Sequence, residues 1–465
     1  MEMFVKASFL RMTPLAVALL LMHGSVLADH HAAAPAVNAP DVAQALSALQ
    51  ARLAALEARN AELEKRLSGG AEPTEAALRQ RVEALESEIV ALHEKPEVFP
   101  RLAGVNAGAS LLMVAQRGRG TGVSESQLSA RADIEVELPM GSIGEAEGKL
   151  FAHFRAGEGD GVAAGGFATT NAVGGFGTSR PALMQAWYQL DVPVGGRSGE
   201  LGQVEITVGK IDPFGFFDGN NAADDESEQF LNLAFIHNPQ LDASGDIGVG
   251  SDGASPGVRV AYVSDINGGN HITASLGLFG AGKGGDYIGT FSKPLTLAQL
   301  EYAGKPFAGL EGAYRVYAWN NSRAFDGVND VDANGEFDDI QEAHRGWGFS
   351  LDQQVTPHVT VFSRYGHSTR GVLAFDRAFT VGAQVAGGAW GRADDHLGIA
   401  YGVLKSSNEY ETAGSGRGNE TLAELYYAWR ANDHLQLSPG VQRIHNTAGS
   451  GTDVTVWSLR AKASF

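Results

Sequence analysis

Between residues 104 and 465 the chain divides into short segments in which apolar and polar side chains alternate, and this pattern constrains the fold more than any other feature. In the segment 454–465, Trp457 and Leu459 share one face while Arg460 and Lys462 share the other. Successive side chains of a β-strand point to opposite faces, so a period of two predicts strands. Sixteen such segments follow one another, most with a length near the roughly nine to eleven residues of a membrane-spanning strand. They cover 104–115, 127–138, 146–156, 182–192, 202–210, 256–263, 271–280, 298–304, 309–320, 346–355, 358–367, 378–386, 396–405, 421–430, 434–445 and 454–465.

The connections between these segments alternate in length almost throughout. Three that belong to the short set are 305–308, 356–357 and 431–433. The long set contains 157–181, 211–255, 281–297, 321–345 and 406–420. Outer-membrane barrels sort their connections in this way, with short turns at the periplasmic end and longer loops outside, and closure leaves no unpaired edge strand. We therefore expect residues 101–465 to form an all-β, 16-stranded antiparallel transmembrane β-barrel.

The first 28 residues have the composition of a secretory signal peptide. Lys6 and Arg11 precede an apolar stretch over 14–22, and Val26-Leu27-Ala28 supplies the small residues of a cleavage site. The apolar stretch is too short to span a bilayer as a helix. We expect cleavage after Ala28, export across the inner membrane and a mature protein in the bacterial outer membrane. Residues 29–41 are rich in Ala and Pro and are expected to form a flexible leader.

Residues 42–95 carry leucines at alternating spacings of three and four, as at Leu46, Leu49, Leu53 and Leu56. This heptad pattern predicts an N-terminal α-helical coiled coil, and Asn60 falls at a core position where a buried amide fixes register. A single amphipathic helix that lies on a domain is the alternative. We expect a periplasmic coiled coil that makes the protein a homotrimer, although leucine at both core positions leaves the oligomer number open.

Composition and motifs exclude several classes of function. The net charge is −19, which argues against a general nucleic-acid binder. The chain has no Cys, which excludes a cysteine nucleophile, and its 13 His form no HExxH metal motif. We therefore expect neither an enzyme nor a resident organic cofactor. The glycine-rich stretch 157–176 lacks the lysine of a phosphate-binding loop and is predicted to be a flexible loop.

If the apolar face of each strand contacts lipid, the polar face lines the lumen and brings several cations and two tryptophans inside. A cation can brace the wall by pairing with a neighbouring carboxylate. Alternatively, guanidinium forks can bind vicinal hydroxyls and aromatic faces can stack on pyranose rings, which would create a sugar path. The candidate lumen residues are Arg131, Lys149, Arg155, Arg259, Arg315, Arg364, Arg430, Trp187 and Trp319.

The connection 211–255 contains a regular pattern of its own. Acidic residues at 224–228 lead into apolar positions that end before Pro239, which predicts a short helix with a charge-stabilised N-terminus. Phe230, Leu233 and Ile236 are expected to pack it against a wall. A loop of this length calls for a function, and if it folds into the lumen it narrows the pore and sets selectivity.

The run GKIDPFGFFDGNNAADDESEQFLNLAFIHNP at 209–239 resembles the signature region of the carbohydrate-selective porins, the OprB family. Residues 394–401 and 424–442 resemble later blocks of that family, and the last strand with its terminal Phe465 is similar to the closing strand of outer-membrane barrels. The matching positions are Gly209, Lys210, Asp212, Pro213, Phe217, Asp218, Asn220, Gln229, Phe230, Leu231, Asn232, Asn238 and Pro239. With the acidic run added, the candidate constriction residues are Asp212, Phe217, Asp218, Asn220, Asp224, Asp225, Glu226, Gln229 and Asn232.

The resemblance implies an outer-membrane porin that lets small sugars diffuse through a water-filled lumen, among lipopolysaccharide in the outer leaflet. The coiled coil departs from the simplest members of the family. An anion-selective or general porin is the alternative transport function, because lumen arginines would also attract anions. A third hypothesis is a structural tether whose coiled coil contacts peptidoglycan or another envelope protein.

One long connection carries a pattern that suits a calcium site. Asp330, Asp332 and Asn334 occupy positions one, three and five, with Gly335 at six and Asp338 at nine. Position twelve is Gln341 instead of the usual glutamate. The segment is predicted either to bind a structural Ca²⁺ or to form a solvated acidic loop.

Overall fold

A computed structural model of the protein describes residues 104–120, 122–174, 178–195, 201–241, 254–265, 269–280, 291–325, 328 and 341–465. The predicted signal peptide, leader and coiled coil lie outside the described residues, as does the predicted calcium segment Asp330, Asp332, Asn334 and Asp338. Among the described residues, no helix is both long enough and apolar enough to cross a bilayer.

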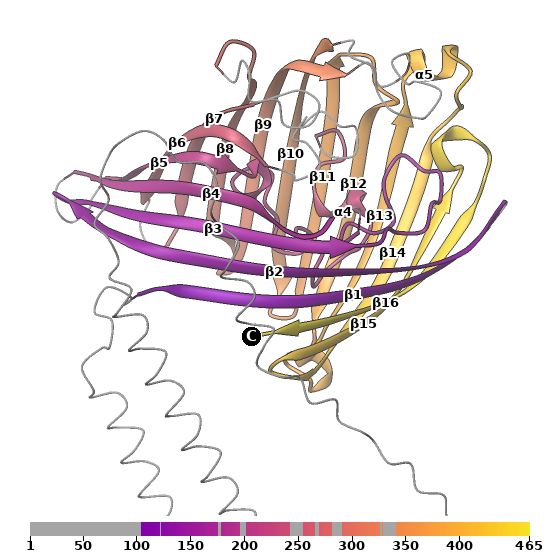
Figure 1. Cartoon of the computed structure of the whole chain (residues 1–465), viewed down its shortest axis with the longest axis horizontal. Coiled ribbons are helices and arrows are strands. Elements are labelled where there is room, and N and C mark those ends of the chain that lie inside the picture. Colours follow the sequence, from indigo (N-terminus) through magenta and orange to yellow (C-terminus); the bar gives the residue numbers. More distant parts are fainter. Residues whose placement is uncertain are drawn as a thin grey trace, which may run out of the picture. The chain divides into compact units, whose positions relative to one another are not determined.

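The described residues form sixteen strands that close into one barrel, in which each strand pairs antiparallel with its neighbours in the chain and β1 pairs with β16 (Figure 1). All sixteen predicted strands are confirmed, with ends that differ by a few residues. Their bounds are β1 (Asn106–Gly120), β2 (Val123–Ile143), β3 (Ala146–Glu158), β4 (Thr178–Val194), β5 (Gly202–Ile211), β6 (Ser255–Asp265), β7 (His271–Phe279), β8 (Leu295–Phe307), β9 (Leu310–Phe325), β10 (Gln341–Thr356), β11 (Val359–Arg370), β12 (Phe375–Ala386), β13 (His396–Ser406), β14 (Glu420–Asn432), β15 (Leu435–His445) and β16 (Val454–Ser464).

The two ends of the barrel differ in the length of their connections. At the short-turn end β2 joins β3 through 144–145 and β8 joins β9 through 308–309. At the long-connection end β5 joins β6 through 212–254 and β13 joins β14 through 407–419. The connection between β1 and β2, at 121–122, is an exception because it is short at the long-connection end.

The wall is apolar on its outside, as the alternating pattern predicts. On β1, Leu111 and Met113 are 47% and 45% exposed, whereas Leu112 and Val114, which alternate with them, are buried. Trp457 on β16 is 58% exposed on the same outer face. Large apolar side chains that point away from a closed barrel need a hydrocarbon environment, because water would make that exposure unfavourable.

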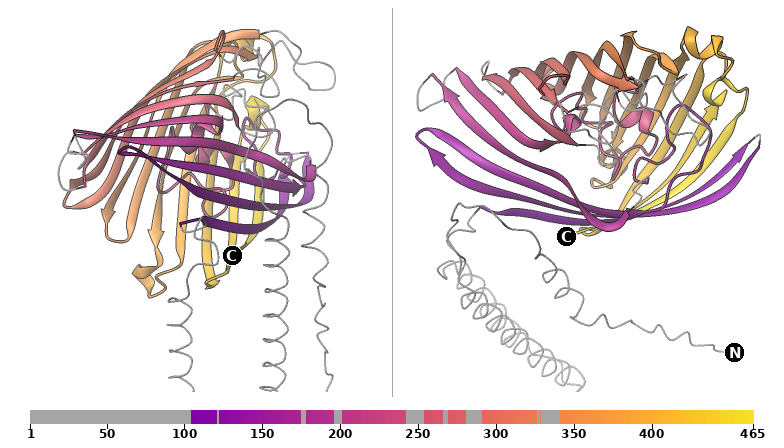
Figure 2. Two further views of the ribbon diagram at one scale, coloured as in Figure 1. Left: turned by 60° about the vertical axis from the view of Figure 1, so that its left-hand side comes forward. Right: turned by 45° about the horizontal axis from the view of Figure 1, so that its top comes forward.

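Two connections fold into the ring of strands (Figure 2). The first, residues 212–241, is called the long inner loop and contains the 3₁₀ turn η3 (Pro213–Gly215) and the short helix α4 (Leu233–Ile236). The second, residues 159–174, is called the short inner loop. The two are joined by backbone hydrogen bonds from Ala172 N to Leu231 O at 2.8 Å and from Leu233 N to Thr169 O at 3.1 Å. Together they fill part of the lumen.

Two predictions for these connections were wrong in detail. The helix in the long inner loop covers only Leu233–Ile236, and the Asn232 side chain caps it by accepting from Ala234 N at 3.1 Å. The acidic residues lie in turns before it, because they bond there instead; Asp225, for example, accepts from Ser227 N at 2.7 Å. Phe230 and Ile236 are buried, and Leu233, which is partly buried, packs against the same apolar cluster, as predicted.

The short inner loop, predicted to be a flexible loop, packs against the wall. Gln116 of β1 accepts from Val162 N at 2.9 Å and donates to Thr170 O at 2.8 Å. The Glu420 carboxylate accepts from Phe167 N at 2.9 Å, and a Cβ at Gly166 would lie 2.8 Å from that carboxylate. Glycine at this position therefore permits a close approach of the backbone to the wall. The glycine-rich composition alone predicts a flexible loop instead.

The inner loops bury two apolar clusters inside the barrel, so the interior is not polar all round as the sequence suggested. One cluster packs Phe230, Phe235 and Ile236 of the long inner loop against Phe362 and Leu404 of the wall. The other packs η3 and its neighbours against β4, β7, β8 and β9, with members such as Phe214, Phe217, Trp187, Phe279, Tyr317 and Trp319. These clusters close parts of the lumen, and a cavity lies on the side of β1 to β4 and β16.

Candidate functional site

The long inner loop is held to β11 by Arg364, whose side chain is fully buried. Its Nε donates to Asp218 Oδ1 at 3.2 Å, and its Nη2 donates to the Asp218 carbonyl at 3.0 Å. Its Nη1 donates to the carbonyls of Ala223 at 2.5 Å and Phe235 at 3.0 Å. Only a guanidinium offers enough donors in fixed directions for such a set, so Arg364 fixes three points of the loop at once.

The opposite side of the loop is held by a carboxylate and a second guanidinium. Glu424 of β14 accepts from Leu231 N at 2.7 Å and Asn232 N at 2.9 Å. Arg460 of β16 donates to the carbonyls of Glu226 and Gln229, both at 2.8 Å. Both wall residues are buried. They compensate the polar backbone of a segment that lies away from bulk water, which would otherwise be costly to bury.

Several predicted constriction residues shape the loop from within. Asp218 is fully buried and accepts from Tyr317 Oη at 2.6 Å and from Asn238 N at 2.5 Å. The Gln229 side chain accepts from the backbone N–H groups of Asp224 and Asp225 at 2.7 and 3.0 Å. Four other predicted constriction residues also make contacts within the barrel. Phe217 is buried against Phe279, and Asp212 accepts from Phe214 N at 3.0 Å. Asn220 donates to Leu351 O at 3.1 Å, and Asn232 donates to Gln442 Oε1 at 3.0 Å.

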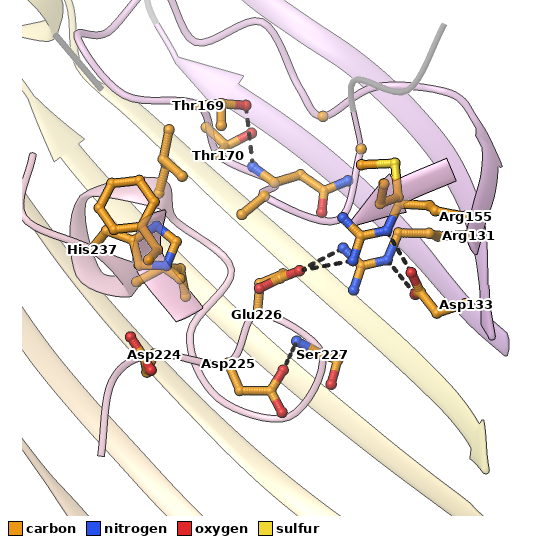
Figure 3. A pocket seen from close by; sticks show the side chains of 18 of the residues that line it. Arg131, Asp133, Arg155, Thr169, Thr170, Asp224, Asp225, Glu226, Ser227 and His237 are labelled. Carbon is orange, nitrogen blue, oxygen red and sulfur yellow. Dashed lines mark hydrogen bonds and ion pairs between the residues drawn. The ribbon is translucent and has the colours of Figure 1, made fainter. Parts of the chain in front are cut away.

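A cavity of about 1330 Å³ lies between the inner loops and the wall formed by β1 to β4 and β16 (Figure 3). Arg131, Arg155 and Lys462 line its wall side. Asp224, Asp225 and Glu226 line the side of the long inner loop, together with Asp212, Phe214 and His237. This volume is large enough to admit a small, polar solute, and the lining lets the solute contact both the wall and the loop.

A charged group, called the arginine cluster, spans this cavity between wall and loop. Arg131 Nη1 lies 2.6 Å from Glu226 Oε1, and Arg131 Nε lies 2.8 Å from Asp133 Oδ2. Arg155 also contacts Asp133 and reaches to 4.0 Å from Glu226, while His153 Nε2 lies 2.8 Å from Asp133 Oδ1. Figure 3 shows the two arginines side by side, with Glu226 of the long inner loop opposite.

Two acids of the long inner loop have different protonation behaviour. Burial favours the neutral form of Glu226, but the attraction of Arg131 and Arg155 outweighs it and lowers the pKa of Glu226 to about 2. Burial raises the pKa of Asp224 to about 7, against the attraction of His237 and Arg364. Because 34% of the Asp224 side chain still contacts the cavity, where water favours the charged form, we expect it to titrate at or below this value. Glu226 is therefore charged throughout the physiological range, whereas Asp224 becomes charged at a higher pH than a solvent-exposed aspartate does.

Phe214 and His237 form a flat stacked pair that borders the same cavity. Their ring centroids lie 3.8 Å apart and their planes differ by 3°. A stacked pair of this kind is rigid, and its apolar faces can contact the C–H face of a sugar ring. The cavity thus combines forked donors, carboxylate acceptors and an aromatic surface, which are the groups that recognise hydroxylated rings.

The remaining predicted lumen residues lie away from this cavity. Arg259 pairs with Glu205 at 2.8 Å and its guanidinium lies 4.7 Å from the centre of the Phe216 ring. Arg315 pairs with Glu301 and, at 3.0 Å, with Asp352. Trp187 stacks on Phe151 with ring centroids 4.9 Å apart, and both Trp187 and Trp319 belong to the second apolar cluster. Arg430 Nη2 lies 3.9 Å from Glu228 Oε1. Lys149 is partly buried on β3.

Sequence reasoning missed several residues of the cavity. His153 and Lys462 are not among these, because alternation predicts them on the lumen faces that also carry Arg155 and Arg460, and both line the cavity. Phe214 and His237 lie inside the motif at 209–239, but nothing in their spacing indicates that they stack. The short inner loop contributes Thr169, Thr170 and Asn171 to the lining without a detectable pattern in its sequence.

Comparisons with known proteins give one family match and several structural matches. Residues 104–465 match the carbohydrate-selective porin, OprB family. The high-pH structure of Pseudomonas putida OprB has a TM-score of 0.63 and 18% identity, over 78% of this chain and 94% of that chain. The low-pH structure of the same protein has a TM-score of 0.46 and 16% identity, over 78% and 93%. A loop L8 deletion mutant of OmpT, an outer membrane protein of Vibrio cholerae, has a TM-score of 0.47 and 12% identity, over 78% and 99%.

No curated protein matches this chain. The family match covers the whole barrel, including both inner loops and the cavity that they border. The first of the structural matches has the fold of the described residues and nearly the same extent as the barrel. This chain is therefore a member of the OprB family of carbohydrate-selective porins and lies in the outer membrane.

Proposed function

We propose that this outer-membrane carbohydrate porin selects sugars in the cavity between the arginine cluster and the Phe214–His237 pair. The observation that carries the proposal is the coincidence, in one cavity, of forked donors on the wall and a flat aromatic surface on the loop. A hydroxylated ring could bond to Arg131, Arg155 and Glu226 while its C–H face contacts the aromatic pair. The inner loops bring these two surfaces within reach of one solute.

Replacing Arg155 with Ala is expected to weaken the block of ionic current by a sugar. A hydrogen bond to a charged group contributes about 1.5–3 kcal/mol, so its loss should raise the sugar concentration needed for half block by about tenfold or more. Single-channel recording in a planar bilayer, with the sugar titrated from either side, measures this. Arg417→Ala is the matched control, because Arg417 is 90% exposed in the connection 407–419. Equal half-block concentrations in wild type and Arg155→Ala would overturn the proposal.

A general or anion-selective porin remains the alternative transport function. The cations of the cavity favour anions, but Asp133, Glu226 and Glu228 pair with them and reduce that preference. Swelling rates of proteoliposomes with neutral sugars and with organic acids of equal size separate the two functions. Faster entry of the acids would favour the anion porin.

We propose that residues 42–95 form a periplasmic coiled coil that joins three chains. The support is the heptad pattern with Asn60 at a core position. Deleting residues 29–95, with the signal peptide kept, should convert a cross-linkable trimer into a monomer and leave sugar permeation unchanged. If the shortened protein still cross-links as a trimer, the coiled coil does not set the oligomer. If the cells instead leak periplasmic proteins, the tether to peptidoglycan or another envelope protein gains support.

We also keep the Ca²⁺ site at Asp330, Asp332, Asn334 and Asp338 as a proposal, supported by the spacing of its oxygen ligands alone.

A further inference from the structure

The outer wall changes character near the long-connection end of β1, β15 and β16. On β1 the outward positions run from Leu111 and Met113, which are apolar, to Arg117 and Arg119, which are exposed. On β15, Arg443 is exposed on the same outer surface, with 53% of its side chain accessible. A lipid-facing wall that turns cationic at one end marks the level at which hydrocarbon gives way to charged headgroups.

The register of the sheet places these cations next to one another. Thr455 of β16 lies directly between Arg119 of β1 and Arg443 of β15, with Cα atoms paired on both sides. Strands lie about 4.8 Å apart, so the backbones that carry the two arginines are separated by about 10 Å. One step nearer the middle of the barrel, Arg117 pairs with Trp457. We call Arg117, Arg119, Arg443 and Thr455 the outer basic patch.

Two serine hydroxyls and one carboxylate lie beside the four residues of the outer basic patch. Ser124 and Ser126 of β2 pair with Arg119 and Arg117, and both serines are exposed. Arg443 donates to Thr455 Oγ1 at 2.9 Å and to Asp453 Oδ2 at 2.7 Å. Among the described residues no ion pair involves Arg117 or Arg119. The patch therefore keeps an excess of positive charge and offers both guanidinium and hydroxyl donors.

Basic residues continue around the wall at the same end. Arg377 of β12 pairs with His367 of β11 on one side and with Lys405 of β13 on the other. Arg377 and Lys405 are exposed. The short-turn end differs, since its outer face carries aromatic residues such as Trp390 and Trp429, both 41% exposed. The chain as a whole has a net charge of −19, so a cationic outer face at one end runs against the overall composition.

We propose that the outer basic patch binds the phosphate groups of lipopolysaccharide in the outer leaflet. Long connections of outer-membrane barrels face the outside, so the patch lies at the level of the lipid headgroups of that leaflet. Guanidinium forks bond phosphate in two-point fashion, and the serine and threonine hydroxyls can donate to the same oxygens. Below the patch, Met113, Trp457 and Leu459 provide an apolar surface for acyl chains. Charge and apolar contact thus fit the two parts of one amphipathic molecule.

Binding of lipopolysaccharide to the purified full-length porin, measured by native mass spectrometry in detergent, tests the proposal. Replacing Arg117 and Arg119 together with Gln should reduce the fraction of lipid-bound porin by about tenfold or more, because both guanidinium groups that would bond phosphate are then lost. Arg119→Gln alone should have a smaller effect. Lys305→Gln is the control, because Lys305 is 56% exposed at the short-turn end and should leave binding unchanged.

Two further lipids test whether the outer basic patch recognises the phosphate groups of lipopolysaccharide. Enzymatically dephosphorylated lipopolysaccharide should bind wild type as weakly as the double variant binds the intact lipid. Phosphatidylglycerol, which carries one phosphodiester, should bind wild type less well than lipopolysaccharide, and equal binding would refute the choice of lipid. Undiminished binding of the intact lipid by Arg117→Gln/Arg119→Gln would overturn the proposal. Sugar block should be unchanged in that double variant, so the outcome is independent of the proposed cavity.

Discussion

Replacing Arg364 with Met should release the long inner loop and raise the single-channel conductance. Methionine has a similar length but no donor, so it leaves Asp218 as a buried carboxylate and leaves the carbonyls of Ala223 and Phe235 without their partner. Removing one member of a buried pair costs about 3–5 kcal/mol. A loss of about 3 kcal/mol shifts the equilibrium between attached and detached loop by about two orders of magnitude. Because β11 keeps its backbone pairing with β10 and β12, the barrel itself should persist.

Conductance in 1 M KCl and limited proteolysis of the reconstituted porin measure this release. The variant should conduct more than wild type and be cut within 212–241, whereas wild type should resist cleavage there. Arg364→Lys keeps the charge beside Asp218 but not the fork, so its conductance should fall between the two. Arg370→Met is the control, since Arg370 is exposed at the end of the same strand. Wild-type conductance in a folded Arg364→Met barrel would show that this side chain does not hold the loop.

Replacing Glu226 with Gln should shift the ion preference of the pore toward anions. Glu226 is the loop carboxylate that faces Arg131 and Arg155, and its pKa of about 2 keeps it charged at every pH used for such measurements. Without its charge, the cavity presents two arginines and Lys462 against fewer carboxylates. The reversal potential in a KCl gradient should move toward the chloride potential at about 0.1 M salt, where the Debye length is about 10 Å, and less at about 1 M, where it is about 3 Å.

The measurement is better made at pH 5 than at pH 8, because Asp224, whose pKa is raised to about 7, then carries less charge and contributes less to the difference. Glu409→Gln removes the same formal charge from an exposed position on the short helix α5 (Asn408–Thr412) and should leave the reversal potential unchanged. An equal shift in both variants would mean that total charge, and not the arginine cluster, sets the preference.

The barrel could be predicted from sequence because its signal is local. Each strand shows its two faces through alternation, and the lipid outside makes that alternation unusually strict, as on β1 and β16. The interior could not be predicted in the same way. Arg131, Arg155, Arg315 and Arg364 all look alike along their strands, and only their distant partners separate a residue that lines the cavity from one that holds a loop.

Of the two inner loops, only the long one could be predicted from the sequence. The sequence indicated that 211–255 should fold inward, because its length and motif were unusual. It did not indicate the short inner loop, since Gly and Ala leave no periodic pattern and its contacts are made by backbone groups with Gln116 and Glu420. The predicted helix was too long because the acidic run bonds within turns and not along a helix.

The way in which Glu424 and Arg460 hold the long inner loop has a consequence for how such pores diversify. Both side chains bind main-chain groups, namely the N–H of Leu231 and Asn232 and the carbonyls of Glu226 and Gln229. Every residue except proline offers these groups, whatever its side chain. Substitutions along this stretch can therefore alter what a passing solute meets while the attachment persists. Mutation can then change the solute preference of the pore without first having to rebuild its scaffold.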